Sequence, residues 1–119
     1  MRPASVASVA HAFRQTVWRL RSAEEAHVRS SETFLIPSRG VRRDLHVGDL
    51  AKLLVEGTTG GREIVVERMW VEVTDATDGR YRGVLRNTPF LIEIPASTVI
   101  EFGPEHVAAY ASPPRRRSS

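Results

Sequence analysis

Cysteine is absent from this sequence, and its absence removes several kinds of site at once. Disulfide bonds, thiolate catalysis and zinc sites built on cysteine are excluded. The composition is compatible with a reducing compartment, so we expect a cytoplasmic protein. Long hydrophobic runs are missing too. No apolar stretch approaches the roughly 20 residues that a membrane-spanning helix needs, and we therefore expect no membrane partner.

Lysine is scarce, and the basic charge is gathered at the two ends of the chain. Lys52 is the only lysine among the 17 basic residues. Residues 1–30 contain five Arg and two Glu, residues 31–111 contain nine basic and twelve acidic residues, and residues 112–119 contain three Arg, giving net charges of +3, −3 and +3. A nucleic-acid-binding domain usually carries basic charge across its body. Association with nucleic acid would here depend on the Arg-rich termini, as a nonspecific, salt-sensitive attraction.

The remaining composition is that of one folded domain. A chain of 119 residues, with 41% hydrophobic and 26% charged residues, is large enough to bury a single core. We expect an N-terminal helical segment over residues 1–30, an antiparallel sheet domain over residues 31–111 and a disordered basic tail over residues 112–119.

The N-terminal segment has helical periodicity. Apolar residues recur at spacings of three and four, which predicts an amphipathic helix within residues 5–28. This stripe consists of Val6, Ala10, Phe13, Val17 and Leu20. Trp18 lies on a different face of this helix, where it would either cover part of the domain or take part in recognition. Because the first 22 residues contain no acidic residue, a mitochondrial transit peptide is an alternative interpretation.

Short strand patterns follow along the rest of the chain. The strands are expected at residues 33–36, 50–56, 63–74, 80–87, 90–94 and 97–102. A loop or single helical turn is expected over residues 37–46, and a closing helical turn over residues 103–110. Short strands at this spacing hide their edges best when the sheet bends strongly. The fold class we predict is α+β: an N-terminal amphipathic helix with a strongly bent antiparallel sheet or small SH3-like barrel of five to six strands.

The hairpin around Trp70 has two possible registers. A five-residue loop over residues 75–79 would pair Trp70 with Val84 and Val71 with Gly83. The alternative is a two-residue Asp-Gly turn. It ranks second because it would oppose the core-facing Val73 to Val84 and mix the two faces of the sheet. In the preferred register Met69, Val71 and Val73 face the core and Trp70 faces the opposite side.

The face that carries Trp70 is the candidate binding site. It presents an aromatic residue and Val84, with arginines around them, which is the composition of an interaction hot spot. The candidate residues are Trp70, Arg68, Arg82, Val84 and Arg86, together with Trp18. The alternative is that the N-terminal helix lies over this face and buries Trp70.

Catalytic and metal-binding patterns are weak. The four histidines are dispersed, and His46 with Asp49 indicates only a local hydrogen bond in a turn. Glu105 and His106 could form an acid–base pair, although a carboxylate after Pro104 also suits the first turn of a helix. We predict no catalytic residue, no metal ligand and no cofactor.

Three stretches carry a resemblance to a known family. The stretches "ERMWVEVT", "GRYRGVLRNTPF" and "VIEFGPEHV", in this order and spacing, resemble the YegJ-like bacterial domain-of-unknown-function family. The matching positions are Glu67, Met69, Trp70, Val71, Gly83, Leu85, Asn87, Pro89, Phe102, His106 and Val107. The chain departs from the family at Ala96 and Ser97, where a Gly-Asp turn is usual, and at its closing "AAY". The resemblance implies a compact α+β or barrel-like domain and no established activity.

These observations favour a non-enzymatic binding or accessory module with a protein partner. The contact would use the face around Trp70 or the helix stripe. Two alternatives are kept. One is a nucleic-acid-associated protein that uses its Arg-rich termini. The other is a small hydrolase-like enzyme built on Glu105 and His106.

Overall fold

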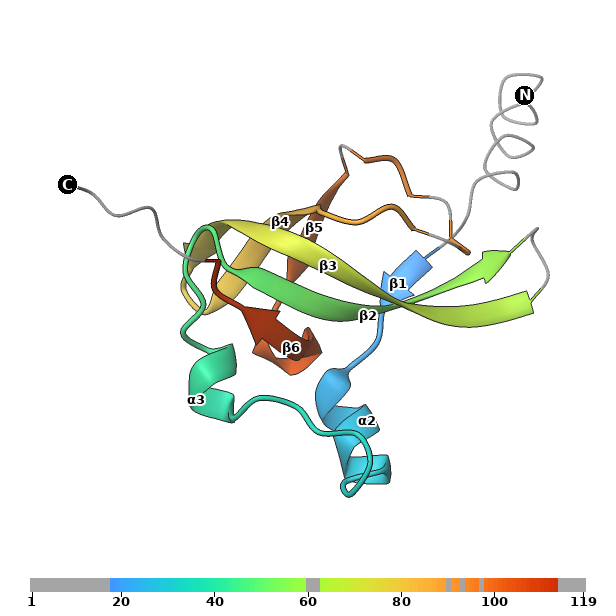
Figure 1. Ribbon diagram of the computed structural model, residues 1–119, viewed down its shortest axis with the longest axis horizontal. Helices are drawn as coiled ribbons and strands as arrows, with labels where there is room; N and C mark the ends of the chain where they lie inside the picture. Colours follow the sequence, from blue (N-terminus) through green and yellow to red (C-terminus); the bar gives the residue numbers. More distant parts are fainter. Residues whose placement is uncertain (1–17, 60–62, 90, 93, 97, 114–119) are drawn as a thin grey trace, which may run out of the picture.

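The computed structural model describes residues 18–59, 63–89, 91–92, 94–96 and 98–113 (Figure 1). Its elements are β1 (Trp18–Leu20), α2 (Ala23–Arg29), α3 (Arg39–Arg42), β2 (Leu50–Thr59), β3 (Glu63–Thr77), β4 (Arg80–Leu85), β5 (Val99–Phe102), the 3-10 helix η1 (Pro104–His106) and β6 (Val107–Ala111). No helix in these ranges is long and apolar enough to cross a membrane.

The strands form one curled antiparallel sheet, which confirms the predicted mixed α+β class with a bent sheet of five to six strands. The strand order is β1-β2-β3-β4-β5, and β6 pairs with β2. One edge of β2 pairs with β3 along its whole length, and the other edge is divided between β6 and β1. Because η1 connects β5 directly to β6, the chain returns from one end of the sheet to the other as the sheet curls (Figure 1).

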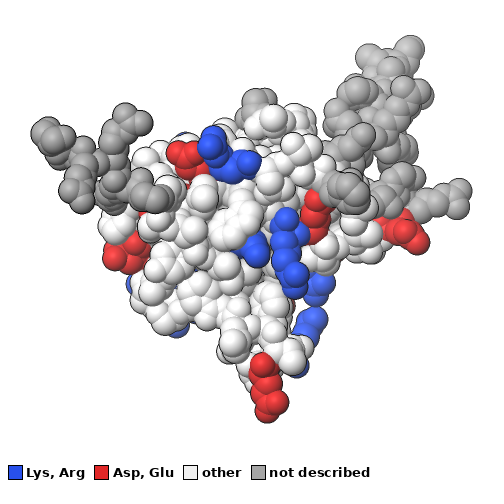
Figure 2. Space-filling model, viewed as in Figure 1, with Lys and Arg blue, Asp and Glu red and all other residues white. Residues whose placement is uncertain are grey.

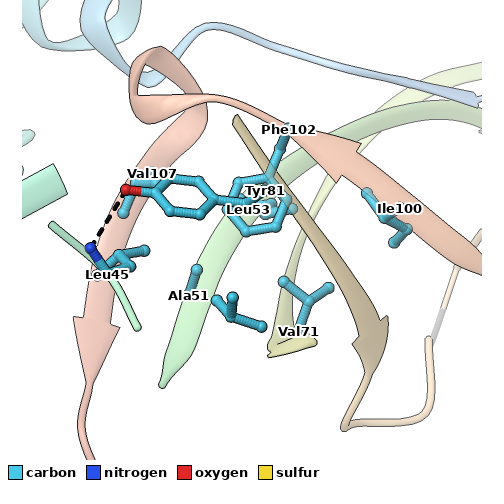
Figure 3. Close-up of a cluster of buried hydrophobic side chains, with 9 residues drawn as sticks. Leu45, Ala51, Leu53, Val71, Tyr81, Ile100, Phe102 and Val107 are labelled. Atoms are coloured by element: carbon cyan, nitrogen blue, oxygen red, sulfur yellow. Dashed lines mark hydrogen bonds between the residues drawn. The ribbon is translucent and has the colours of Figure 1, made fainter. Parts of the chain in front are cut away.

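The inner side of the curled sheet holds the core. Two inner clusters of buried side chains lie there, formed by Leu45, Ala51, Leu53, Val71, Val73, Tyr81, Ile100, Phe102 and Val107, and by Val55, Met69, Ile92 and Ile94. The Tyr81 and Phe102 rings lie 5.2 Å apart, centroid to centroid. The Tyr81 hydroxyl donates to the Arg42 carbonyl (2.8 Å) and accepts from the Leu45 N–H (3.2 Å, Figure 3), so its burial leaves no polar atom unsatisfied.

A second, smaller layer covers part of the opposite side of β2. Leu54 is buried there with Ala23 and Ala108, and Ala26, Phe34 and Ile36 pack against them, forming the outer cluster. A buried arginine ties this layer together, since Arg42 donates to Glu24 Oε2 (2.6 Å) and to the carbonyl oxygens of Pro37 (2.9 Å) and Pro104 (2.8 Å). These bonds join α3 to α2 and to η1.

The predicted continuous helix over residues 5–28 is wrong in its described part. Trp18–Leu20 form β1, which pairs with β2 at Val55–Gly57, and the helix α2 begins only after Ser22. The Ser22 hydroxyl accepts from the Glu25 N–H (3.1 Å) and starts the helix there. Trp18 and Leu20 both pack against the inner clusters, so β1 satisfies an otherwise open edge of β2 and covers the core. Residues 1–17, with most of the predicted stripe, lie outside the described residues.

Three smaller predictions are also corrected. Residues 33–36 form no strand, because Phe34 and Ile36 serve as anchors that pack on Leu54. The described residues of the 90–94 stretch are likewise irregular. Glu67 accepts from the N–H groups of Leu91 (2.8 Å) and Ile92 (3.0 Å), so a side chain binds this backbone in place of a neighbouring strand. The closing helical turn is limited to η1, after which β6 is extended. The helical turn expected within residues 37–46 is confirmed as α3.

The preferred hairpin register is wrong, and the two-residue turn is correct. Asp78 and Gly79 have positive φ values of 54° and 75°, and Thr77 pairs with Arg80. A β-bulge between Val73 and Asp75 then shifts the register, so that Val73 opposes Gly83. With this bulge, the two-residue turn no longer places core-facing residues on both faces of the sheet, because Val73 and Tyr81 both point inward.

The predicted alternation of β3 is confirmed. Met69, Val71 and Val73 are fully buried in the inner clusters. Trp70 is only partly buried and belongs to none of the three hydrophobic clusters. Its indole therefore lies on the side of the sheet that faces away from the core.

Candidate functional site

The outer face of the sheet consists of the side chains of β2, β3 and β4 that alternate with the core residues. They include Leu50, Lys52, Leu54, Glu56, Val66, Arg68, Trp70, Glu72, Arg82 and Val84. Figure 2 shows Lys and Arg side chains gathered over the middle of the sheet and toward α2 below it. This face therefore combines apolar, aromatic and basic groups with the carboxylates of Glu56 and Glu72.

Trp70 is held firmly on the outer face. Its backbone N–H donates to Asn87 Oδ1 (2.6 Å), and its backbone carbonyl accepts from the Arg86 N–H (2.9 Å). Lys52, its direct partner across the β2–β3 ladder, places its ammonium 5.0 Å from the centre of the indole ring. This is a cation–π contact. The Asn87 side chain takes the place of a backbone partner where β4 has ended, so the backbone of Trp70 is fixed at the point where the β3–β4 ladder stops.

The predicted site residues separate into three groups. Arg68 and Val84 lie with Trp70 on the outer face, and Arg86 follows at the end of β4, where it pairs with Glu72 (Nε–Oε1 3.4 Å). Arg82 lies on the same face but nearer the turn, and it pairs with Glu101 of β5 (3.2 Å). Trp18 lies elsewhere, on β1 against the inner clusters.

A groove continues the outer face from Arg68 toward α2. It is open to solvent and has a volume of about 800 Å³, and it is lined by Arg21, Ala26, Arg29, Ser30, Thr33, Phe34, Leu54, Val66, Glu67, Arg68 and Leu91. Leu54 and Phe34 belong to the outer cluster, so this part of the lining is apolar and well packed. Val66 and Leu91 are 41% and 46% exposed, and they leave apolar surface of the lining uncovered.

Positive charge predominates in this groove. Arg21 shares Glu56 with Arg19, at N–O distances of 3.6 Å and 3.1 Å. In the described part of the chain, the side chains of Arg29 and Arg68 make no ion pair. Glu67 is the acidic lining residue, and its carboxylate already accepts two backbone N–H groups. The local field therefore favours a negatively charged ligand.

Sequence reasoning missed Lys52, Arg21 and Arg29 as members of this surface. Lys52 could have been found by extending the β2–β3 hairpin back from its glycine-rich loop, since that register places it opposite Trp70. Arg21 and Arg29 reach the groove only because β1 and α2 pack on the sheet. No local pattern signals that placement.

Glu105 and His106 both have structural partners. The Gly103 N–H donates to His106 Nδ1 (3.0 Å), while Glu105 Oε2 lies 3.2 Å from Arg80 Nη1 and 3.7 Å from His106 Nε2. Burial lowers the pKa of His106, with Glu105 opposing and Arg80 adding to the shift. Burial would raise the pKa of Glu105, but a backbone hydrogen bond, His106 and Arg80 together lower it. The pair caps η1 and joins it to β4.

Comparison with known proteins adds no relative from which a site could be transferred. No family model, no curated protein and no solved structure matches the chain.

Proposed function

We propose that this protein is a non-enzymatic binding module that docks a protein partner on its outer face, around Trp70. The observation that carries the proposal is the partly buried indole, which contacts Lys52 on the outer face and belongs to no hydrophobic cluster of the described chain. An aromatic anchor beside Lys52 and Arg68, with apolar surface next to it, has the composition of an interaction hot spot. A reducing compartment, the cytoplasm, is its proposed location.

The finer fold assignment is also a proposal. A small SH3-like barrel is supported by three features: β6 pairs with β2, β5 leads to β6 through a 3-10 turn, and β2 to β4 are consecutive antiparallel partners. Such barrels leave a sheet face and its loops open for binding partners.

Membership of the YegJ-like family is proposed on similar grounds. Several residues that carry the resemblance have local structural duties: Asn87 binds the Trp70 backbone, Gly83 packs on the Glu72 backbone, and His106 caps η1. Proteins that share a fold are expected to retain residues that specify the same local geometry.

Affinity purification tests the proposed function. The full chain would be used as bait beside Trp70→Ala and a control, Tyr110→Ala, which removes an aromatic ring that is 43% exposed on β6. Thermal unfolding would establish that both variants are folded. We expect the wild type and Tyr110→Ala to recover the same protein and Trp70→Ala to lose it, with direct titration of the purified partner giving the same order. Equal recovery by a folded Trp70→Ala variant would refute the proposal.

A further inference from the structure

We infer that the groove beside Trp70 binds an acidic peptide segment of the partner, in which Asp or Glu side chains flank apolar ones. This inference deepens the proposed function and depends on it. It commits the groove to one kind of occupant.

The shape and lining of the groove suit a peptide. Leu54 and Phe34 supply packed apolar surface, and Val66 and Leu91 supply apolar surface that is still exposed to water. Covering these side chains with a Leu or Phe of the partner would remove apolar area from water, which stabilises a complex by about 25 cal/mol per Å² before the costs of association. A groove of about 800 Å³ has room for several side chains.

The arginines of the groove favour a peptide with acidic residues around its apolar side chains. Arg68 reaches the groove from β3 and Arg29 from α2, and neither side chain makes an ion pair within the described residues. Arg21 is only partly neutralised, because it competes with Arg19 for Glu56. Arginine forms bidentate hydrogen bonds with carboxylates, so these side chains would fix the register of Asp and Glu residues.

The same features argue against a nucleic acid in the groove. A nucleic-acid strand needs a continuous basic track and aromatic faces on which its bases stack. Here Glu67 lies in the lining and Glu56 lies beside Arg21, so carboxylates interrupt the track. Phe34 is engaged with Leu54 in the outer cluster. An apolar strip between arginines fits a peptide better than a polyphosphate.

The test uses fluorescence anisotropy with the full chain. The probe is a fluorescein-labelled peptide in which Asp and Glu alternate with Leu and Phe. A second peptide carries Gln in place of every acidic residue, and a third probe is a single-stranded oligothymidylate of equal charge. The groove variant is Arg29→Glu with Arg68→Glu. Its matched control is Arg39→Glu with Arg43→Glu, which makes the same change in net charge at two exposed arginines of α3 and its cap.

We expect the acidic peptide to bind the wild type and the control with affinities within about twofold of each other. The groove variant should bind at least about tenfold more weakly, because each close charge pair is replaced by repulsion. Binding should weaken as salt is added. The inference would be overturned if both double variants lost the same affinity for the acidic peptide, or if the wild type bound the Gln peptide as tightly as the acidic one. It would also be overturned if the oligothymidylate bound more tightly than the acidic peptide, or if no peptide bound at all. Sedimentation showing that the groove variant abolishes a dimer of the chain would overturn it as well, because the occupant would then be a second copy.

Failure of this inference can be told apart from failure of the proposed function. If the partner recovered through Trp70 binds the groove variant as tightly as the wild type, the groove assignment is wrong and the binding module stands. If purification recovers no Trp70-dependent partner, the proposed function fails whatever the peptide does.

Discussion

Gly83 is a position where one added methyl group would meet backbone. An alanine Cβ there would lie 2.6 Å from the Glu72 carbonyl oxygen and 3.2 Å from its carbon. We expect Gly83→Ala to lower the free energy of unfolding by about 1–3 kcal/mol, since the strands must separate to admit it. Gly40→Ala is the control, because no atom lies within 4 Å of its added Cβ and Gly40 is helical. It should be neutral or raise stability by up to about 1 kcal/mol. Urea unfolding of both variants gives the comparison.

Tyr81 offers a second residue-scale prediction. Its hydroxyl has two buried backbone partners, the Arg42 carbonyl and the Leu45 N–H. Tyr81→Phe keeps the ring packing on Phe102 but leaves both groups unsatisfied, so we expect a loss of about 1–3 kcal/mol in the free energy of unfolding. Tyr110→Phe, at an exposed ring, should change it by less than about 0.5 kcal/mol. Similar values for the two variants would contradict the assigned hydrogen bonds.

His106 makes stability depend on pH. Burial lowers its pKa below the ordinary value of 6.5, so the unfolded chain takes up a proton at a higher pH than the folded chain does. The stability that depends on neutral His106 is therefore full above pH 6.5 and is lost as the pH falls through the folded pKa. Glu105, whose pKa is lowered from 4.5, loses its contribution at more acidic pH.

The variant His106→Asn tests this dependence. An Asn side chain can still accept from the Gly103 N–H but does not titrate. We expect the free energy of unfolding to fall less in the variant than in the wild type between about pH 7.5 and about pH 5.5, by about 1.4 kcal/mol for each unit of the pKa shift. Equal decreases in the two proteins would show that His106 does not carry the effect.

At the scale of elements, Arg42 joins α3 to its neighbours. Its side chain is 7% exposed and binds Glu24 and the carbonyl oxygens of Pro37 and Pro104. Arg42→Met leaves these acceptors without their donor, and we expect a loss of about 3 kcal/mol in the free energy of unfolding. Arg43→Met, at an exposed position on the same turn, should cost less than about 0.5 kcal/mol in chemical unfolding.

Some elements could be predicted from local pattern, and others depend on distant partners. The alternation of Met69, Val71 and Val73 is strict, so the two faces of β3 followed directly. The helical pattern of the N-terminal segment includes Trp18–Leu20, yet these residues form a strand. The open edge of β2 decides between helix and strand here, and a local pattern does not contain that edge. The glycine-rich loop marked the start of β3 at Glu63, but β2 extends to Thr59, past its predicted end at residue 56. Pro104 marked the start of η1, but the helical turn ends at His106 and does not reach residue 110.

The β3–β4 hairpin also combines a feature that local sequence predicts with one that depends on distant residues. The sequence favours the Asp-Gly turn only second, because an unbroken two-residue hairpin would mix the faces of the sheet. A single bulge after Val73 restores inward-facing Tyr81 and places Gly83 against the Glu72 backbone. Val73 and Tyr81 are both buried because they pack against β5 and the rest of the core. The bulge that allows this therefore depends on distant residues and cannot be predicted from the hairpin sequence alone.

At the scale of the whole molecule, the curled sheet separates a closed interior from an open face. Five of the six candidate residues from the sequence, Arg68, Trp70, Arg82, Val84 and Arg86, lie on or beside that open face, and Trp18 does not. The groove next to it depends on the packing of β1 and α2, which the sequence pattern did not predict. The part of the site on one hairpin was thus predictable, and the part assembled from distant segments was not.

Photo-cross-linking tests the outer face most directly. A benzophenone amino acid would replace Val84, which lies on the outer face, and in a separate variant Val47, which is 62% exposed in the turn before β2. We predict one discrete protein adduct from position 84 after irradiation in cells, its loss when Trp70→Ala is added, and no such adduct from position 47. Adducts of equal yield from both positions, or an adduct from position 84 that persists without the indole, would contradict the account.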